Sequence, residues 1–163
     1  MNTQYARLQM VNQQVRGWNV YDEEVLAMLR ELPREHFVRE GFESLAFADV
    51  ALPIGHGEYM MTPTIEGRLL QALSLDGDER VLEIGTGSGF MTACLARLAD
   101  HVTSIDIYGD FIDSATTRLS DEGINNVDLL QMDATRELPD GSFDAIAVTG
   151  SIQSFDPRLV EAL

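Results

Sequence analysis

The amino-acid sequence predicts an α/β fold built on a doubly wound, mostly parallel sheet. An apolar run at residues 81–84 ends in three glycines at alternate positions, Gly85, Gly87 and Gly89, and continues directly into a helical pattern. Strand-like and helix-like patterns then alternate as far as residue 149, which is typical of strands joined by crossover helices. In such sheets a ligand lies beyond the carboxyl ends of the strands, so we expect a binding site at the glycines.

The core is expected to contain four strands, at residues 80–84, 102–107, 127–132 and 143–149. Helical patterns at residues 89–98 and 111–119 connect the first three strands. Right-handed crossovers favour the sheet order 3-2-1-4. The fourth strand is mostly apolar, as inner strands are, and yet it stands at an edge. Either the last strands of the sheet are missing, or another copy of the chain covers this edge and forms a homo-oligomer.

An N-terminal helical extension precedes the sheet. Apolar residues at helical spacing predict a helix over residues 9–18, in which Trp18 would be a core residue or an anchor between helices. Asp22 is expected to cap a second helix, which Pro33 ends.

Residues 46–63 have little regular periodicity and predict a shaped loop. Two glycines flank His56, and Met60 and Met61 follow as exposed methionines. Thr62 then has the position of a helix N-cap, directly before a proline. Loops of this kind often carry binding residues, so this segment is a second candidate site.

Acidic residues stand at the carboxyl ends of the first three strands. Glu83, Asp106 and Asp133 would therefore converge on the crevice beside the glycines. Asp106 follows the glycines by about 20 residues, the separation from which a carboxylate accepts both ribose hydroxyls. A dinucleotide-binding turn would need a glycine where Phe90 stands. The G-x-G-x-G spacing after an acid instead resembles the first motif of S-adenosylmethionine-dependent methyltransferases.

The 163 residues are expected to make one structural domain. In it, residues 1–63, the helices and substrate loop, pack on a cofactor-binding core at residues 64–163.

Composition excludes several classes of partner. The 27 acidic residues outnumber the 11 basic residues, all arginines, and the net charge is −16. Such a surface repels phosphate backbones and anionic membranes, so neither nucleic acid nor membrane is an expected partner. The charge serves either solubility or adaptation to high salt or a GC-rich genome.

A metal site is not expected either. The single cysteine, Cys94, lies in the helical pattern after the glycines and is interpreted as a packed core thiol. The amino terminus has no apolar signal region, and no apolar run reaches the roughly 18 residues of a membrane span. The sequence therefore predicts a cytoplasmic protein.

Four stretches of the chain resemble the protein-L-isoaspartate O-methyltransferase family. They are residues 10–16 (MVNQQVR), 33–38 (PREHFV), 48–57, which include L-P-I-G-H-G, and 81–89 (VLEIGTGSG). The resemblance implies a Rossmann-like methyltransferase fold of seven strands with S-adenosylmethionine as cofactor. It also implies methylation of the abnormal carboxyl group of isoaspartyl residues, which starts protein repair. Family members usually continue beyond the point that matches Leu163, in agreement with the open edge of the expected sheet.

The resemblance further implies roles for individual residues. Glu83 and the glycine turn would contact the methionine part of the cofactor, Asp106 the ribose and Asp133 the adenine. The full set of expected cofactor-binding residues is Glu83, Gly85, Thr86, Gly87, Ser88, Gly89, Asp106, Ile107, Asp133 and Ala134.

The chain departs from the family directly after L-P-I-G-H-G. The family typically reads Gln-Thr-Ile-Ser-Gln-Pro there, with its serine at the reacting centre, whereas residues 58–63 read Glu-Tyr-Met-Met-Thr-Pro. Met61 stands at the position of that serine, which leaves the catalytic residue unknown. Loss of a hydroxyl that pairs a buried carboxylate costs about 1–3 kcal/mol. The residues expected to bind the acceptor are His56, Met60, Met61 and Thr62.

Three functions stay open at this point. The first is methylation of an isoaspartyl-containing protein or peptide, whose carboxylate is already ionised and needs no general base. The second is methylation of a small molecule or another protein group, favoured by the apolar Met60 and Met61, with His56 either as a base or as an organiser of the loop. The third is a non-catalytic module that binds the cofactor or a partner.

Overall fold

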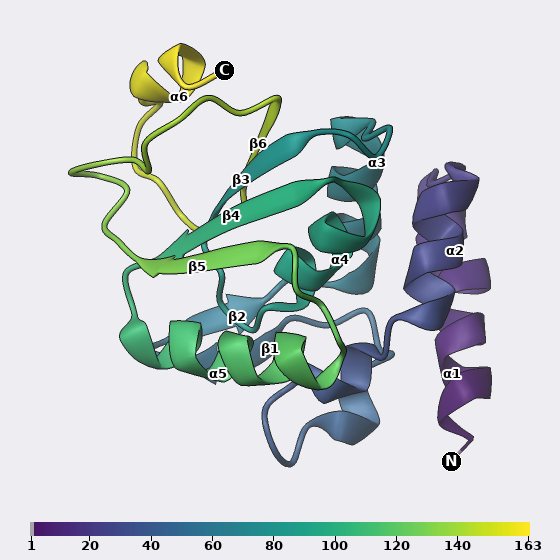
Figure 1. Cartoon of the computed structure of the whole chain (residues 1–163). Helices are drawn as coiled ribbons and strands as arrows, with labels where there is room; N and C mark the ends of the chain where they lie inside the picture. The colour runs from purple at the N-terminus through teal and green to yellow at the C-terminus, as the bar shows by residue number, and fades with distance from the viewer. Residues whose placement is uncertain (1) are drawn as a thin grey trace. The chain divides into compact units, whose positions relative to one another are not determined.

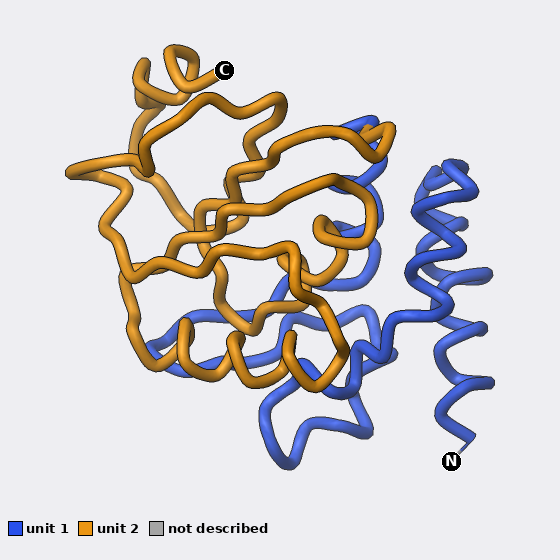
Figure 2. Tube along the Cα trace, in the orientation of Figure 1, with its two compact units in different colours: residues 1–74 blue, residues 75–163 orange. Residues whose placement is uncertain are grey.

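The computed structural model describes residues 2–163 and divides the chain into two compact units (Figure 2). The first unit is Met1–Ser74 and the second is Leu75–Leu163. The sequence suggests a division after residue 63, but helix α3 (Pro63–Leu73) belongs to the first unit. The helix that follows the candidate acceptor loop is therefore part of the same unit as the loop.

The first unit opens with a continuous helical segment. Helix α1 (Thr3–Gln9) runs into a π-helical turn (Met10–Val15) and a 3₁₀ turn (Arg16–Trp18), and Asn19 ends the segment with a φ of +62°. The predicted helix is thus present and begins earlier than expected. The expectation that Trp18 is a core residue or an anchor between helices is wrong, because Trp18 is 57% exposed. The buried apolar side chains of this segment come from the π-helical turn.

Helix α2 (Glu23–Glu31) begins where the sequence predicts. The Asp22 carboxylate accepts hydrogen bonds from the backbone N–H groups of Glu24 and Val25, at 2.9 and 3.2 Å. These bonds satisfy two of the amides that a helix start leaves unpaired. Two 3₁₀ turns follow, Arg34–His36 and Glu43–Leu45.

The segment expected to be an irregular loop contains a short antiparallel hairpin. Strand β1 (Leu52–Gly55) pairs with strand β2 (Glu58–Met60), and Gly55 lies opposite Glu58. The two residues between the strands, His56 and Gly57, have φ angles of +52° and +77°. Positive φ at both central positions is the geometry of a type I′ hairpin turn. Strands of four and three residues are too short for a clear alternation of apolar and polar residues, which is why the sequence pattern missed them.

A buried guanidinium connects three parts of the first unit. Arg34 forms a two-point ion pair with the Glu66 carboxylate on α3, with both N···O distances 3.0 Å. It also donates to the carbonyl oxygens of Ala46 and Met61, at 2.6 and 2.7 Å. Both charged side chains are fully buried. Since a buried charge is tolerated only with such partners, this contact fixes the backbone at Met61.

The second unit contains a four-stranded parallel sheet in the order β5-β4-β3-β6 (Figure 1). The strands are β3 (Arg80–Ile84), β4 (His101–Asp106), β5 (Val127–Gln131) and β6 (Ala145–Val148). This arrangement confirms the predicted order 3-2-1-4. Strand β3 lies inside the sheet and β6 at its edge.

Three helices complete the second unit: α4 (Phe90–Leu98), α5 (Gly109–Asp121) and α6 (Arg158–Glu161). Helix α4 packs on β4, and α5 packs on β4 and β5. A buried cluster joins β3 and β4 to the last helix through Leu82, Ile84, Ile105, Phe143 and Leu159. The carboxyl ends of β3 and β4 therefore lie on a packed core.

We expect Arg34→Met to lower the free energy of unfolding by about 3–5 kcal/mol, because it leaves the Glu66 carboxylate buried and unpaired. Combining Arg34→Met with Glu66→Leu should restore part of this loss, and urea denaturation of all four proteins measures the coupling. Arg16→Met is the control, since the ion pair between Arg16 and Glu23 is exposed and should contribute less than about 1 kcal/mol. Additive losses in the double variant would show that the buried pair is not coupled.

Candidate functional site

The glycine turn after β3 is held by its neighbours in the second unit. The backbone N–H groups of Gly85 and Thr86 both donate to the carbonyl oxygen of Ile105, at 2.8 and 3.2 Å. Gly85 has a φ of +109°, and a Cβ added there would lie 2.4 Å from the backbone nitrogen of Gly150. Only glycine fits such a close approach of two backbones. The turn therefore presents bare backbone at the carboxyl end of the sheet.

Asp106 joins this turn to the end of β4. One carboxylate oxygen accepts the N–H of Gly87 at 2.9 Å, and the other accepts the N–H of Tyr108 at 3.0 Å. Each carboxylate oxygen can accept about two hydrogen bonds, so the group is fixed in place and keeps acceptor capacity. This geometry suits a carboxylate that receives ligand hydroxyls, and the ribose role of Asp106 stays a prediction.

Glu83 has a fully buried carboxylate surrounded by hydroxyl groups. The hydroxyls of Thr92 on α4 and Ser104 on β4 donate to one oxygen, the second at 2.6 Å, and the hydroxyl of Thr149 lies 3.4 Å from the other. Burial raises the pKa of Glu83 to about 7, although these three hydrogen bonds lower it. In the structure the carboxylate is thus engaged by the protein itself, and its contact with the methionine part of a cofactor stays a prediction.

These three hydroxyl residues were not among the predicted site residues. Each stands in an otherwise apolar pattern, within α4, within β4 or just after β6. A hydroxyl at a buried position is itself a signal, because it needs a hydrogen-bond partner there.

The start of α4 is stabilised by the turn that precedes it. Ser88 Oγ accepts the N–H of Phe90 at 3.2 Å, and the Ser88 carbonyl accepts a hydrogen bond from Arg118 at 2.9 Å. Thr86 pairs its buried hydroxyl with that of Ser104 at 2.6 Å. The remaining amides of this helix start favour negative groups.

Asp133 lies in a tight turn just beyond β5. Its carboxylate accepts the backbone N–H and the hydroxyl of Thr135, at 3.0 and 2.6 Å, and lies 3.3 Å from Arg136 Nε. The hydrogen bond from the Thr135 hydroxyl is the main reason that the pKa of Asp133 is lowered. Ala134 is half-buried against the core, and Ile107 is 57% exposed. The structure thus brings Glu83, Asp106 and Asp133 to the carboxyl ends of adjacent strands.

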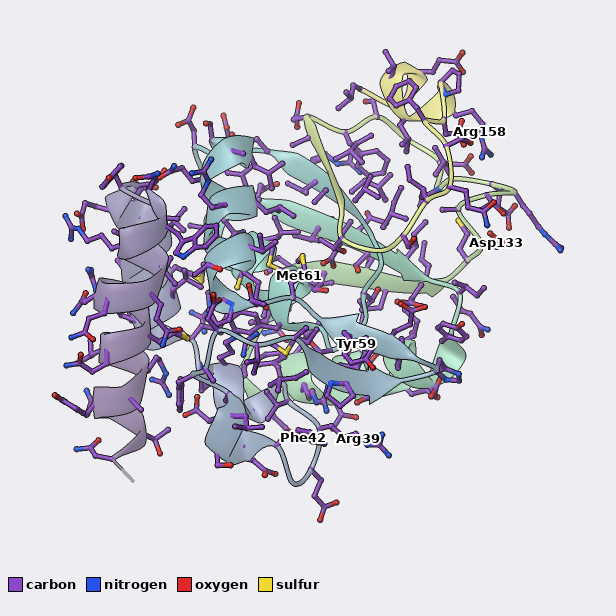
Figure 3. All side chains as sticks on the ribbon, turned by 180° about the vertical axis from the view of Figure 1, so that it is seen from behind. Arg39, Phe42, Tyr59, Met61, Asp133 and Arg158 are labelled. Atoms are coloured by element: carbon purple, nitrogen blue, oxygen red, sulfur yellow. The ribbon has the colours of Figure 1, made fainter. Side chains whose placement is uncertain are left out.

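In the first unit, the predicted acceptor residues lie along the hairpin: His56 is in its turn, and Met60, Met61 and Thr62 are at the end of β2, where Figure 3 labels Met61. His56 occupies the exposed hairpin turn and has the positive φ angle that this turn requires. Its place in the chain is therefore explained by the backbone geometry of the turn. Met60 is 5% exposed, so the expectation of an exposed methionine is wrong at this position. Met61 is half-buried, and its carbonyl accepts from Arg34.

The hydroxyl of Thr62 is engaged by the side chain of Thr64 and not by a backbone amide of α3. Thr62 is the N-cap residue but makes no side-chain cap hydrogen bond. Its Oγ1 lies 3.1 Å from Thr64 Oγ1, which donates to Asp49 Oδ1 at 2.8 Å. Because Thr64 has a single hydroxyl proton, Thr62 must be the donor to Thr64. The single hydroxyl proton of Thr62 is therefore used by Thr64, and the hydroxyl can offer only lone pairs to an acceptor molecule.

Residues 2–163 contain no helix that is long and apolar enough to cross a membrane. Over the same residues, no group of three or more His, Cys, Asp or Glu side chains is arranged to hold a metal ion. Cys94 is buried in α4, as expected for a packed thiol.

Comparisons of the sequence with a family model and with individual proteins point to the same family. The family model described as protein-L-isoaspartate(D-aspartate) O-methyltransferase matches residues 6–163. A protein-L-isoaspartate O-methyltransferase of Rhodopseudomonas palustris (strain HaA2) is 46% identical over 96% of this chain and 63% of its own length. One from Opitutus terrae is 40% identical over 96% of this chain and 68% of its own length. The chain thus spans about two thirds of the length of these relatives.

A solved structure shares the fold. It is described as a protein-L-isoaspartate O-methyltransferase from Plasmodium falciparum in complex with S-adenosyl-L-homocysteine. It aligns with a TM-score of 0.80 over 96% of this chain and 79% of its own length, at 20% identity. At that identity the likeness shows the fold, which is the Rossmann-like methyltransferase fold.

The raised pKa of Glu83 predicts a pH-dependent stability. Its carboxyl group has a folded-state pKa of about 7 against an ordinary value of 4.5, so the folded protein holds this proton more tightly. Its contribution to the free energy of unfolding is therefore complete below pH 4.5 and is lost as the pH rises through 7. Relative to Glu83→Gln, the wild type should lose on the order of 3 kcal/mol between pH 4.5 and pH 8 in urea denaturation.

Glu79→Gln is the matched control, because hydrogen bonds from the backbone N–H of Asp76 and neighbouring amides lower the pKa of Glu79. The sign of its pH dependence should be the opposite. A difference between wild type and Glu83→Gln that stays constant over this pH range would contradict the assignment.

Proposed function

The chain belongs to the protein-L-isoaspartate(D-aspartate) O-methyltransferase family, and we propose that it transfers the methyl group of S-adenosylmethionine to a protein carboxyl group of the isoaspartyl type. The family match over residues 6–163 is the observation that carries this proposal. The cofactor would be held by the second unit, and the acceptor by the loop and hairpin of the first.

The residues of the second unit fit the cofactor chemically. The glycine turn brings bare backbone to the ligand, and Asp106 keeps lone pairs for two ribose hydroxyls. Asp133 would accept a hydrogen bond from the amino group of adenine, and the start of α4 favours the carboxylate of the methionine part. Bound there, the sulfonium group supplies a methyl group that a nucleophile attacks in line.

An isoaspartyl acceptor needs little chemical help from the protein. Its carboxylate is ionised at neutral pH, so no general base has to remove a proton. The work of the chain is then to orient the acceptor and to exclude water. The place of His56 in an exposed hairpin turn agrees with a reaction that uses no base.

A second candidate keeps the cofactor and changes the acceptor to a small molecule or another protein group. Met61 favours it, because a half-buried thioether replaces the hydroxyl that the family offers to a carboxylate. Thr62 does not replace that donor directly, since its proton is used by Thr64.

Further features follow from the same proposal. They are a role in protein repair, a cytoplasmic location, and pairing of the β6 edge with another chain. Each rests on the family resemblance, on the sequence pattern or on the position of β6 in the sheet.

Transfer of a labelled methyl group tests the proposed activity. We expect incorporation into an isoaspartyl peptide and none into the same peptide with normal aspartate. In calorimetry, Asp106→Asn should weaken binding of S-adenosyl-L-homocysteine by about 1.5–3 kcal/mol, roughly 10- to 150-fold, because charged hydrogen bonds are lost. Asp121→Asn, at the exposed end of α5, is the control. Cofactor binding with transfer only to small acceptors would favour the second candidate, and binding without any transfer would leave a non-catalytic module.

Met61→Ser should raise kcat/KM for an isoaspartyl peptide about tenfold or more, because it returns a hydroxyl donor worth about 1–3 kcal/mol. Affinity for S-adenosyl-L-homocysteine should not change. Met60→Ser is the matched control, since Met60 is buried and the change should cost stability without raising activity. An unchanged kcat/KM in a folded Met61→Ser variant would show that this position does not govern the acceptor.

A further inference from the structure

Arg158, the first residue of α6, forms hydrogen bonds with the turn that carries Asp133. Its guanidinium donates to the carbonyl oxygens of Ala134, Thr135 and Arg136, at 2.9, 3.2 and 2.9 Å. Figure 3 shows Arg158 and Asp133 at the same end of the second unit. Three successive carbonyls of one turn are thus bound by a single side chain.

The guanidinium is itself held in one orientation by Asp156. Arg158 Nε donates to both oxygens of the Asp156 carboxylate, at 3.1 and 2.9 Å, and Nη2 also contacts it. The backbone N–H of Arg158 donates to the same carboxylate at 3.0 Å. Since a guanidinium is planar and rigid, fixing one edge on Asp156 aims the other N–H groups at the turn.

Hydrogen bonds hold the exposed part of this turn, whereas Ala134 also packs against the core. Thr135 and Arg136 are exposed, so apolar contacts contribute little to their position. Within the turn, the Asp133 carboxylate accepts from Thr135, and the Asp133 carbonyl accepts the N–H groups of Arg136 and Glu137 at 2.9 and 3.1 Å. Arg158 binds the carbonyls of residues 134–136. Both the N–H groups and the carbonyls of the turn are therefore hydrogen-bonded.

A preformed turn matters for recognition. A binding group that is already fixed loses less conformational freedom when its ligand arrives. The direction of the Asp133 carboxylate follows the backbone of this turn, because Thr135 holds it locally. Arg158 does not have to touch a ligand to influence what Asp133 binds.

We propose that Arg158 is a positioning residue for purine selectivity: by clamping residues 134–136 it aims the Asp133 carboxylate at the 6-amino group of the cofactor's adenine. This inference rests on the proposed function. A carboxylate accepts from an amino group and repels a carbonyl oxygen, so a correctly aimed Asp133 prefers adenosyl over inosyl ligands.

The test compares the affinities of S-adenosyl-L-homocysteine and its inosine analogue by calorimetry. Arg158→Met should weaken binding of the adenosyl ligand about tenfold and the inosyl ligand much less, so that the ratio of the two affinities falls. Arg158→Lys should restore only part of the ratio. An ammonium group still donates hydrogen bonds to the carbonyls, but it donates fewer of them and lacks the planar geometry of a guanidinium. Asp133→Asn should lower the same ratio and make it insensitive to Arg158. Arg97→Met, which removes an exposed and long hydrogen bond to Glu122, should change neither affinity.

A second measurement needs no ligand. Hydrogen exchange at the amides of Thr135, Arg136 and Glu137 should speed up in Arg158→Met and stay unchanged in Arg97→Met, with urea denaturation confirming that both variants are folded. Faster exchange with equal losses for both ligands would overturn the selectivity role, and unchanged exchange would overturn the clamp. If the wild type bound neither ligand, the proposed cofactor and the selectivity role would fall together, while the exchange rates would still decide the clamp.

Discussion

The buried carboxylate of Glu83 is the constraint on which the candidate cofactor site depends. A carboxyl group inside a protein is tolerated only when its oxygens are hydrogen-bonded. Here the donors come from α4 and β4, and the Thr149 hydroxyl after β6 lies beside the second oxygen. These are the elements that frame the glycine turn. Satisfying one carboxylate therefore sets the spacing of the strands and the helix around the turn, and Asp106 then fastens the turn from the next strand.

The first unit follows the same physical rule with a buried basic group. Arg34 is fully buried, and its partners are the Glu66 carboxylate and the carbonyls of Ala46 and Met61. The backbone at the position where the family has its serine is thus held by a charged contact rather than by that residue's own side chain. This separation explains how Met61 can occupy the position without disturbing the local fold.

Hydroxyl groups play different parts in the two units. Around Glu83 they donate to a buried carboxylate, and each has a fixed partner. Beside Met61, Thr62 donates its proton to Thr64, and Thr64 donates its own to Asp49. The proposed binding site for the methyl donor therefore keeps the residues that the family motif implies. The proposed binding site for the methyl acceptor instead offers hydroxyl lone pairs and the thioether of Met61. Selectivity between acceptors depends on this small region.

Local pattern by itself determined the order of the parallel sheet, the Asp22 cap and the convergence of Glu83, Asp106 and Asp133 on adjacent strand ends. These features depend on residue spacing within one element and on the handedness of its connections. Only the tertiary structure decided the β1–β2 hairpin, the exposure of Trp18, the burial of Met60 and the membership of α3 in the first unit. It also supplied the contacts of Arg34 and Arg158. The reason is physical: the partners of these residues lie 12 to 32 positions away for Arg34 and 22 to 24 for the carbonyls bound by Arg158, and no local pattern encodes contacts at such separations.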